Sequence, residues 1–334
     1  MTVLVTGASG HLGANLVRGL LDQGEQVRVL VHRSRAAFTD LGAAVETGRL
    51  SFAEGSVLEP ETLRPAFAEC TRVFHLAGVI SIDGDPDGWV RRVNVDGTAN
   101  VAAVCRELGV GRLVHVSSVH AFEQNPRDQT LDETRARVPS GPSRQHSAYD
   151  RSKAEGERAV LAEIERGLDA VVLNPTGIMG PIDFGPSRMG QLVADLAAGD
   201  LPALLDGGFD FVDVRDVSAS VIAAGERGRC GEGYILGSAW YSLRELAAIV
   251  AEHSGRSAPR LVTPVWVARM GLPFARGLSW ATKTEPLFTR ESLEVLVSNR
   301  SISSAKARRE LGHAPRPLTE TVADTLAWFA ARPG

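Results

Sequence analysis

Cysteine is scarce in this sequence, and neither sign of charge is in marked excess. The 334 residues include three cysteines, widely separated at Cys70, Cys105 and Cys230. That number and spacing argue against a disulfide framework and a metal cluster, so we expect no bound metal and a reducing, cytoplasmic location. The formal net charge of −4 gives no electrostatic footprint for nucleic acid.

Long hydrophobic runs are absent as well. The longest candidate, Leu261 to Ala281, is interrupted by Arg269 and Arg276, and no run reaches the ~18 apolar residues of a membrane span. The sequence starts directly in an apolar strand pattern, without the charged leader and apolar core of a signal peptide. With 44% hydrophobic and 23% charged residues, we expect a soluble globular protein with one large domain or two unequal ones.

Glycine, by contrast, is regularly placed near the start. Gly7, Gly10 and Gly13 follow the apolar run Val3–Val5 and precede a helical pattern from about Ala14 to Leu21. A tight glycine turn between a strand and a helix directs backbone amides and the positive end of the helix dipole to one point, which suits a pyrophosphate. The spacing differs from the common G-x-G-x-x-G fingerprint, so a glycine turn without a ligand remains an alternative at this point.

Apolar runs and amphipathic stretches alternate through the first half of the chain. The predicted strands are Val3–Val5, Val27–His32, Leu50–Glu54, Arg72–Leu76, Leu113–Ser117 and Ala170–Leu173. The predicted helices between them include Glu59–Phe67, Val93–Leu108 and Ser152–Arg166. This alternation predicts an α/β fold, a Rossmann-type doubly wound parallel sheet with helices on both faces.

After Asn174 the pattern becomes irregular, because glycine and proline cluster between positions 175 and 186. Further on, the predicted elements are the helices Ser187–Ala198, Val214–Glu226, Ser242–Ser254 and Thr319–Ala331 and the strands Phe211–Val214 and Tyr234–Leu236. We expect a nucleotide-binding domain at 1–178, with returns at about 211–232. Residues 179–210 and 233–334 would form a smaller, mixed α/β substrate-binding portion whose final helix packs back on the body.

Tyr149 and Lys153 are the first candidates for chemistry. Four residues apart on a predicted helix, they lie on one face, one turn from each other. A free phenol has a pKa of about 10, and a neighbouring ammonium, helped by an oxidised nicotinamide, lowers it. Tyr149 could then donate or accept a proton while hydride moves to or from a nicotinamide. An exposed aromatic side chain beside a solvated lysine is the alternative.

Ser118 adds a third group. The strand Leu113–Ser117 runs into it, and ligands of parallel sheets bind beyond the carboxyl ends of the strands. A hydroxyl there could hydrogen-bond a substrate carbonyl next to Tyr149. A lone serine at a strand end more often caps the turn, but the glycine turn, Ser118 and the Tyr149/Lys153 pair in this order favour function.

With these groups the chain resembles the extended short-chain dehydrogenases/reductases over nearly its whole length. The motifs that carry the resemblance are Thr6–Gly13, Phe74–Gly78, Asn94–Thr98, Val116–Ser118, Tyr149 with Lys153, and Lys306–Gly312 followed by Pro315 and Trp328-Phe329. Asn174-Pro175-Thr176 and Glu285-Pro286-Leu287 resemble the dihydroflavonol reductase and cinnamoyl-CoA reductase branch, which borders the 3β-hydroxysteroid dehydrogenases.

The resemblance implies roles for individual residues. Ser118, Tyr149 and Lys153 would be the catalytic triad, and Lys153 would also hold the nicotinamide ribose. The cofactor contacts expected are Gly7, Ser9, Gly10, His11, Leu12, Gly13, His32, Arg33, Ser56, Val57, Leu76, Ala77, Tyr149, Lys153, Pro175, Gly177 and Ile178. The candidate substrate-pocket residues are His120, Phe122, Glu123 and Met179.

Three positions depart from the family pattern. Ser56 stands where an aspartate usually contacts adenine, and Phe122-Glu123 replaces an aromatic-glycine pair. A carboxylate near the pocket is unexpected for a purely apolar substrate. Asn174 replaces the arginine of many sugar-nucleotide epimerases, which argues mildly against that branch.

The end of the second predicted strand indicates which nicotinamide is bound. An NAD-preferring site places an acid there for the ribose 2′-hydroxyl. Here the position is His32, followed by Arg33 and Arg35, and no acid occurs between Glu25 and Asp40. Cationic side chains suit the 2′-phosphate of NADP, so we predict NADP(H) as the cofactor, with solvated loop arginines as the alternative.

The function predicted from the sequence is reduction of a ketone or aldehyde on a hydrophobic, aromatic or polycyclic small molecule. The alternatives are a nucleotide-sugar epimerase or dehydratase with a recycled cofactor, and a non-catalytic NADP-sensing protein. The family resemblance makes a homodimer an option. Trp266, Met270, Phe274 and Trp280 recur at helical intervals, and we interpret them as core, with an apolar cleft as the alternative.

Overall fold

The structure is a computed structural model that describes residues 1–32, 34–81, 84–141, 143, 145–270, 272 and 289–332. At its centre is a seven-stranded sheet of parallel neighbours in the order β10-β6-β5-β4-β1-β2-β3. Its strands are β1 (Thr2–Thr6), β2 (Gln26–Val31), β3 (Leu50–Glu54), β4 (Cys70–His75), β5 (Arg112–Val116), β6 (Ala170–Pro175) and β10 (Gly233–Leu236). The predicted Rossmann-type sheet is confirmed, and its order reverses between β1 and β4, where such sheets bind ligands.

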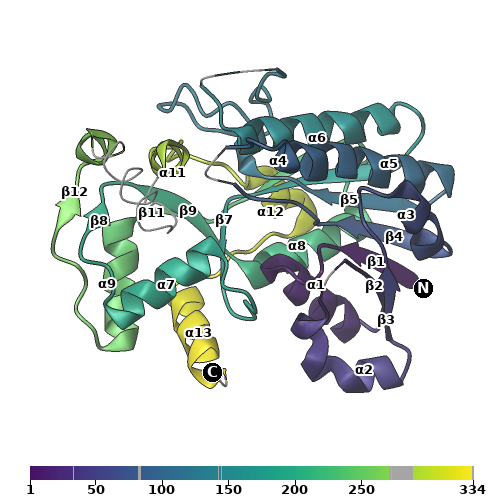
Figure 1. The fold of residues 1–334 in the computed structure, drawn as a ribbon, viewed down its shortest axis with the longest axis horizontal. Helices are drawn as coiled ribbons and strands as arrows, with labels where there is room; N and C mark the ends of the chain where they lie inside the picture. The colour runs from purple at the N-terminus through teal and green to yellow at the C-terminus, as the bar shows by residue number, and fades with distance from the viewer. Residues whose placement is uncertain are drawn as a thin grey trace.

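Helices cover both faces of this sheet (Figure 1). In chain order they are α1 (His11–Asp22), η1 (Ala36–Leu41), α2 (Gly42–Glu46), α3 (Pro60–Phe67), α4 (Trp89–Arg91), η2 (Arg92–Asp96), α5 (Gly97–Glu107), η3 (Val119–Ala121), α6 (Ala148–Ile164), α8 (Val214–Arg227) and α12 (Ala305–Leu311). Val3 and Val5 pack in one apolar cluster with α1 and α8, whereas Leu4 packs in a second with α3, α5 and α6. Side chains of a strand alternate between faces, so a strand buried on both sides reads as a continuous apolar run.

The remaining elements form a second layer beside the sheet (Figure 1). A three-stranded sheet has the order β11-β9-β7, and β12 pairs with β8. These elements are β7 (Gly177–Met179), α7 (Arg188–Ala198), β8 (Leu204–Leu205), β9 (Gly208–Asp213), β11 (Ala239–Ser242), α9 (Leu243–Ser254), β12 (Val262–Thr263), α11 (Arg290–Leu296) and α13 (Leu318–Ala331). A third apolar cluster fills the space between them.

The sheets divide the chain differently from the predicted boundaries in three places. The predicted cut at 178 falls inside β7, which pairs with β9 in the small sheet. The return was expected at 211–232, but β9 up to Asp213 belongs to the small sheet. β10, assigned to the substrate-binding portion, pairs with β6 as the edge strand of the large sheet. These short strands lie close to glycine and proline residues, where the sequence pattern does not say which sheet a strand joins.

The helix that carries Tyr149 and Lys153 starts earlier than predicted. It begins at Ala148, because Ser147 and Asp150 form a reciprocal capping box: each side chain accepts a hydrogen bond from the other residue's backbone N–H. The sequence contained this signal as Ser147-x-x-Asp150. Tyr149 therefore lies in the first turn of α6, at the end of the helix nearest the strand ends.

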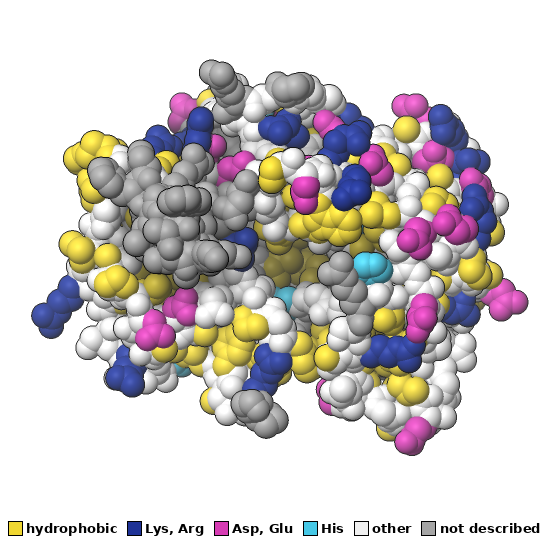
Figure 2. Space-filling view, viewed as in Figure 1, with side chains coloured by type: hydrophobic (Ala, Val, Ile, Leu, Met, Phe, Trp, Pro, Cys, Tyr) yellow, Lys and Arg dark blue, Asp and Glu magenta, His cyan; other side chains and the backbone are white. Residues whose placement is uncertain are grey.

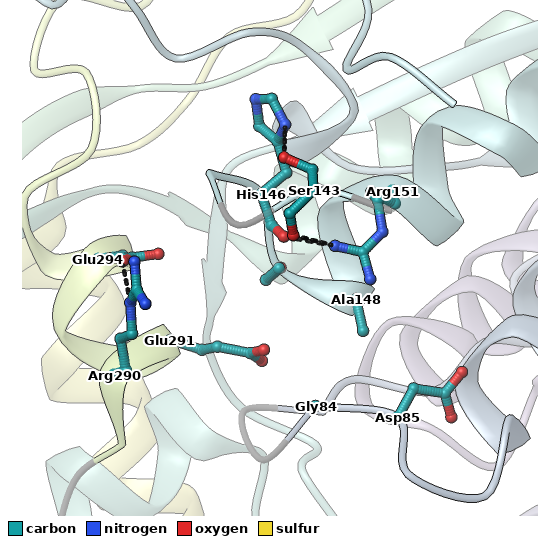
Figure 3. A pocket seen from close by; sticks show the side chains of 10 residues that line it. Gly84, Asp85, Ser143, His146, Ala148, Arg151, Arg290, Glu291 and Glu294 are labelled. Carbon is teal, nitrogen blue, oxygen red and sulfur yellow. Dashed lines mark hydrogen bonds and ion pairs between the residues drawn. The ribbon is translucent and has the colours of Figure 1, made fainter. Parts of the chain in front are cut away.

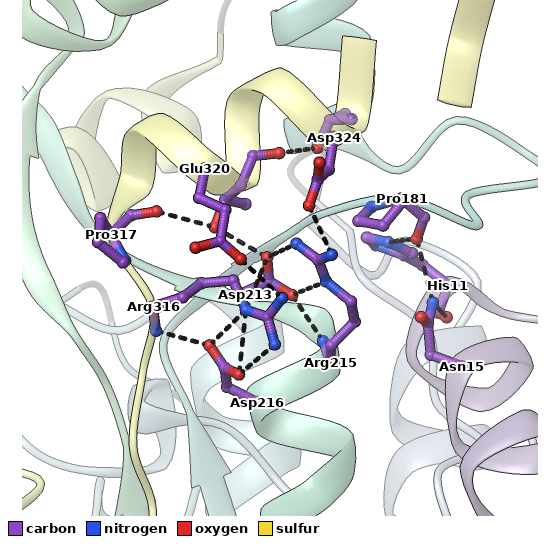
Figure 4. A network of polar contacts seen from close by, with 12 residues as sticks. His11, Asn15, Pro181, Asp213, Arg215, Asp216, Arg316, Pro317, Glu320 and Asp324 are labelled. Atoms are coloured by element: carbon purple, nitrogen blue, oxygen red, sulfur yellow. Dashed lines mark hydrogen bonds and ion pairs between the residues drawn. The ribbon is translucent and has the colours of Figure 1, made fainter. Parts of the chain in front are cut away.

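A partly buried polar network joins the last helix, α13, to the start of α8 (Figure 4). Arg215, in the first turn of α8, bonds Asp213 at 2.7 Å and reaches Asp324 of α13 at 2.6 Å. Arg316, just before α13, bonds Asp216 at 2.8 Å. The network fixes α13 to the end of α8. In the described ranges we find no helix with the length and hydropathy of a membrane span, and no set of three or more His, Cys, Asp or Glu that could hold a metal ion.

Candidate active site

The glycine turn after β1 is shaped by close backbone packing. Gly7 has a φ of +67°, and a Cβ there would lie 2.5 Å from the backbone nitrogen of Ala77. A Cβ at Gly13 would overlap the carbonyl oxygen of Gly7, whereas one at Gly10 would meet only that oxygen, at 3.3 Å. Gly7 and Gly13 therefore let strand, turn and helix approach each other, and the backbone at Gly10 stays open to a ligand.

The first turn of α1 fits an anion. Its N-cap is Gly10, which provides no side-chain cap, and the first turn contains no acidic residue. The N–H groups of Ser9, His11 and Leu12 therefore lie at a bare helix N-terminus, which is a favourable position for a phosphate. The residues present fit the pyrophosphate of a dinucleotide.

The side chain of His11 points to the segment that follows β7. Its Nε2 lies 3.1 Å from the carbonyl oxygen of Pro181, and its Nδ1 lies 4.0 Å from a carboxylate oxygen of Asp183. Asn15 also donates to Pro181, so the start of α1 is fixed to the segment after β7 (Figure 4). The ring is thus enclosed by these partners, and the expected cofactor contact of His11 stays a prediction.

A surface cavity of about 820 Å³ lies beyond the ends of β2 and β3. Its lining residues are Val31, His32, Arg35, Glu54, Gly55, Ser56, Glu59 and Thr62. The Arg35 guanidinium lies 4.6 Å from the centre of the Phe52 ring and 3.4 Å from Glu54. The structure thus brings His32, Arg35 and Ser56 together, while Arg33 lies outside the described residues.

Residues after β3 and β4 surround the glycine turn on its other side. The N–H of Leu76 donates to the carbonyl oxygen of Thr6, and that of Ala77 to the Thr6 hydroxyl. Val57 packs against Gly97 at the start of α5. Asn94 bonds both backbone groups of Val79 and the Ser152 hydroxyl, so it holds the loop after β4 in place.

The structure brings Ser118, Tyr149 and Lys153 together at the carboxyl ends of β5 and β4. The Ser118 side chain lies close enough to the Tyr149 hydroxyl to lower its pKa. The ammonium of Lys153 lies 3.4 Å from the carbonyl oxygen of Val116 and 6.0 Å from the centre of the Tyr149 ring. A Cβ on Gly78 would stand 3.2 Å from that ammonium, so Gly78 leaves the space that the lysine occupies.

Burial is the main cause of the pKa shifts of Tyr149 and Lys153. It raises the pKa of Tyr149 to about 12, although the hydrogen bond from Ser118 acts in the opposite direction. It lowers the pKa of Lys153 to about 8, although the Glu157 carboxylate opposes this shift. Lys153 is not among the groups that shift the phenol pKa, so the expected lowering by this residue is not found. A phenol that stays protonated at neutral pH is in the form that donates a proton.

The Lys153 pKa predicts how stability depends on pH. Between pH 8 and 10.5 the unfolded chain binds the lysine proton and the folded chain releases it, so the free energy of unfolding rises with pH. Below pH 8 the buried ammonium costs at most about 3 kcal/mol, at 1.36 kcal/mol per pKa unit. Lys153→Met should therefore raise the melting temperature more at pH 7 than at pH 9.5, as calorimetry can measure. An equal gain at both values would contradict the assigned pKa.

Glu157 supports the triad from the next turn of α6, and sequence reasoning missed it. Its carboxylate is almost completely buried and bonds Arg137 and Asn174, each at 2.5 Å. Asn174, at the end of β6, also donates to the carbonyl oxygen of Ser118 at 3.0 Å. An acid four residues after Lys153 on the same face of the predicted helix was the available signal.

The candidate pocket residues divide into two kinds. His120 lies edge-on to the Tyr149 ring, with 6.1 Å between ring centres, and its Nδ1 is 3.4 Å from Asp150. Glu123 pairs with His146 at 3.0 Å, which gives the unexpected carboxylate a partner. Phe122 and Met179 have no exposed surface and belong to apolar clusters. In this structure these two form part of the core and do not line a pocket.

Figure 3 shows a cavity of about 280 Å³ at the N-terminal end of α6, next to Tyr149 in the chain. Its lining residues are Gly84, Asp85, Ser143, His146, Ser147, Ala148, Arg151, Arg290, Glu291 and Glu294. Most of these side chains are polar or charged, and none of them was a predicted site residue. Sequence reasoning missed them because α11 and the loop at 84–85 meet α6 only in the folded chain.

The segment after β6 completes the site. β6 is the direct neighbour of β5, so Pro175, the last residue of β6, lies at the strand end beside Ser118. Gly177 and Ile178 lie in β7, where a Cβ on Gly177 would be 3.0 Å from the carbonyl oxygen of Asp210. Ile178 packs partly buried against the cluster that includes α1. Pro175 thus lies at the strand end next to the triad's serine, and the nicotinamide contacts expected of all three residues stay predictions.

Residues 3–237 match the model of the NAD-dependent epimerase/dehydratase family. The chain belongs to this family. A relative from Methylococcus capsulatus, sterol demethylase protein B, is 36% identical, with 99% of each chain covered. A ketoreductase of Stigmatella aurantiaca, named for 4-hydroxy-2-methyl-3-oxo-4-farnesyl-3,4-dihydroquinoline-1-oxide, is 31% identical, with 98% of this chain and 96% of the relative covered. The crystal structure of gox2253 is similar with a TM-score of 0.83, at 33% identity and 98% coverage of both chains.

Further family members among the matches carry the names dihydroflavonol 4-reductase, cinnamoyl-CoA reductase and 3β-hydroxysteroid dehydrogenase. The predicted relation to the extended short-chain dehydrogenases/reductases, and to this branch of them, is confirmed. The chain is therefore a member of an oxidoreductase family, and its large sheet has the Rossmann-type fold that binds nicotinamide nucleotides in this family.

Proposed function

We propose that this protein is an NADP(H)-dependent reductase that converts a ketone or aldehyde of a hydrophobic small molecule to an alcohol. The observation that carries the proposal is the neighbouring pair of Ser118 and Tyr149 hydroxyls beside a buried Lys153, at the strand ends next to the glycine turn. Two adjacent hydroxyls can both donate to one carbonyl oxygen, and one of them can transfer its proton to it.

The chain's own residues would do the following. Gly7, Gly10 and Gly13 with the first amides of α1 hold the pyrophosphate, and Lys153 binds the nicotinamide ribose. When bound, the cofactor supplies the hydride. Ser118 and Tyr149 hold the carbonyl oxygen and stabilise the negative charge that develops on it. Tyr149, held protonated by burial, gives its proton to this oxygen, and the positive charge of Lys153 stabilises the phenolate that remains.

The proposal of NADP over NAD rests on the cavity beyond β2. Its lining includes His32 and Arg35, and the acid that would bind a ribose 2′-hydroxyl is missing at the end of β2. The Arg35 side chain is about half-exposed, and besides the Phe52 ring it contacts Glu54 at 3.4 Å, so its guanidinium can turn to a phosphate in the cavity. The family name specifies NAD, so the preference requires its own test.

Arg35→Ala should weaken NADPH binding by tenfold to a hundredfold, because a hydrogen bond to a charged group contributes about 1.5–3 kcal/mol. NADH, which lacks the 2′-phosphate, should bind equally to both variants. Fluorescence titration measures each affinity. Arg64→Ala is the matched control, since Arg64 is an exposed arginine that pairs with Glu107 on α5. Tighter binding of NADH than of NADPH by the unaltered protein would overturn the NADP assignment.

The proposed substrate class is a carbonyl compound with an aromatic or polycyclic body. One relative is named a sterol demethylase protein, and another is a ketoreductase of a farnesylated quinoline oxide. Both names support a large hydrophobic molecule. The direct test is a panel of hydrophobic ketones and aldehydes in which loss of NADPH absorbance is followed.

The alternative is a nucleotide-sugar epimerase or dehydratase, which the family's name keeps open. Such enzymes recycle the cofactor, so a sugar nucleotide would be converted without net NADPH oxidation. The NADP-sensing alternative is disfavoured, because a sensor has no need of the Ser118, Tyr149 and Lys153 arrangement. The cytoplasmic location and the homodimer expected from the sequence stay predictions.

A further inference from the structure

An apolar surface lies where the sequence suggested core. Leu261, Trp266 and Met270 are 62%, 63% and 62% exposed, and they fall within ten residues of each other. Residues 265–270 are helical, and Trp266 and Met270 lie one turn apart on the same face. Figure 2 shows hydrophobic side chains at the end of the molecule where β12 lies in Figure 1. The interpretation of Trp266 and Met270 as core is therefore wrong.

The opposite face of the same helix packs against the body of the protein. Ala268 is buried, and Val265 packs partly buried against the cluster between α7 and α9. The outward face is therefore a second apolar face of a helix that is already fixed to the body. Single exposed apolar residues are ordinary, but a group of large ones marks a surface that contacts something apolar.

Basic side chains predominate in the segment that carries this face. Arg256, Arg260 and Arg269 are exposed there, whereas Asp206, also exposed, lies beside Thr263, to which its backbone is hydrogen-bonded. The sequence contains no Asp or Glu between Glu252 and Glu285, although acidic residues outnumber basic ones, 40 to 36, in the whole chain. We define the basic apolar face as Leu261, Trp266 and Met270 with these three arginines.

We propose that the basic apolar face binds the surface of an anionic lipid bilayer. Trp266, Met270 and Leu261 would enter the boundary between headgroups and acyl chains, the depth at which tryptophan is enriched. The three arginines would pair with lipid phosphates. The protein lies on the membrane and does not cross it, in agreement with the lack of a spanning helix among the described residues.

A second copy of the chain fits this face less well than lipid does. In a symmetric dimer the same patch meets itself, so arginines would face arginines across the contact. An anionic bilayer offers the opposite charge around an apolar interior. The inference does not depend on the proposed reductase activity, because it rests on exposure and charge alone.

Vesicle flotation tests the inference. The protein should float with vesicles of phosphatidylcholine and phosphatidylglycerol, and binding should weaken with salt and with phosphatidylcholine alone. The Trp266→Ala/Met270→Ala double variant should lose about tenfold or more in vesicle affinity, from the apolar area no longer buried. It should keep its melting temperature, because both side chains are exposed. Val45→Ala, an exposed apolar residue on α2, is the matched control and should bind normally.

Two results would overturn the inference. One is failure of the unaltered protein to float with the anionic vesicles, or equal binding by the double variant. The other is a dimer, seen by light scattering, that the double variant dissociates without any vesicle binding, since the face would then be a protein interface. A fall in the melting temperature of the double variant would be resolved with Arg260→Gln/Arg269→Gln, which must reduce binding to the anionic vesicles.

Discussion

Tyr149→Phe is expected to reduce turnover of a carbonyl substrate by about 10²–10⁴, the range that a positioned proton donor contributes. The substitution removes one oxygen and leaves the ring, which lies edge-on to His120. The Ser118 hydroxyl and the Lys153 ammonium remain, but neither replaces a phenol that already donates to the substrate oxygen. The main loss should therefore be in kcat.

Two measurements separate the chemical role of Tyr149 from a structural one. NADPH affinity, followed by fluorescence titration, and the melting temperature should both stay close to those of the unaltered protein. Ser118→Ala is the comparison variant, because it removes the other hydroxyl of the pair and should also lower kcat. Undiminished turnover by Tyr149→Phe would refute the assignment of this tyrosine as the proton donor.

Glu157→Ala should have the largest effect on stability, a loss of about 3–5 kcal/mol in the free energy of unfolding, as for other broken buried ion pairs. The substitution leaves the Arg137 guanidinium without its carboxylate and Asn174 without its 2.5 Å acceptor. Because Asn174 also holds the Ser118 carbonyl, turnover should fall as well. Urea unfolding measures the first effect, and the carbonyl assay measures the second.

The control for Glu157 is an acid of similar size on the surface. The Glu107 carboxylate pairs with Arg64, and both side chains are exposed. Glu107→Ala should therefore lower the free energy of unfolding by less than about 1 kcal/mol. Glu157→Gln should be milder than Glu157→Ala, since an amide can still accept from Arg137. Equal, small losses for Glu157→Ala and Glu107→Ala would show that the network does not stabilise the fold.

The large sheet was predictable from the sequence because its signals are local. Its strands are short and mostly apolar, and each lies within two residues of its predicted range. The glycine turn and the Tyr149/Lys153 pair were also predictable from the sequence. A turn is set by the few residues that form it, and residues four apart on a helix always lie on one face. The order of glycine turn, strand-end serine and Tyr/Lys pair then indicated the site.

The rest depends on contacts between distant segments. The imidazole of His11 faces Pro181 and Asp183, and nothing near position 11 in the sequence indicates those partners. Phe122 comes shortly after Ser118, the predicted catalytic serine. Its side chain nevertheless packs in an apolar cluster with Ile235, which is more than a hundred residues away in the sequence. Met270 is as apolar as a core residue, and only the packing of its helix shows that it faces outward.

The central claim is that hydride leaves NADPH and stays on the carbonyl carbon of a hydrophobic substrate. Incubation with NADPH that carries deuterium at both hydrogens of the dihydronicotinamide C4, with the substrates found in the carbonyl panel, tests this directly. We expect one deuterium on the carbinol carbon of the product and one NADP⁺ formed for each alcohol. Conversion of a sugar nucleotide with no net NADPH oxidation, and no deuterium in any carbinol product, would contradict the account.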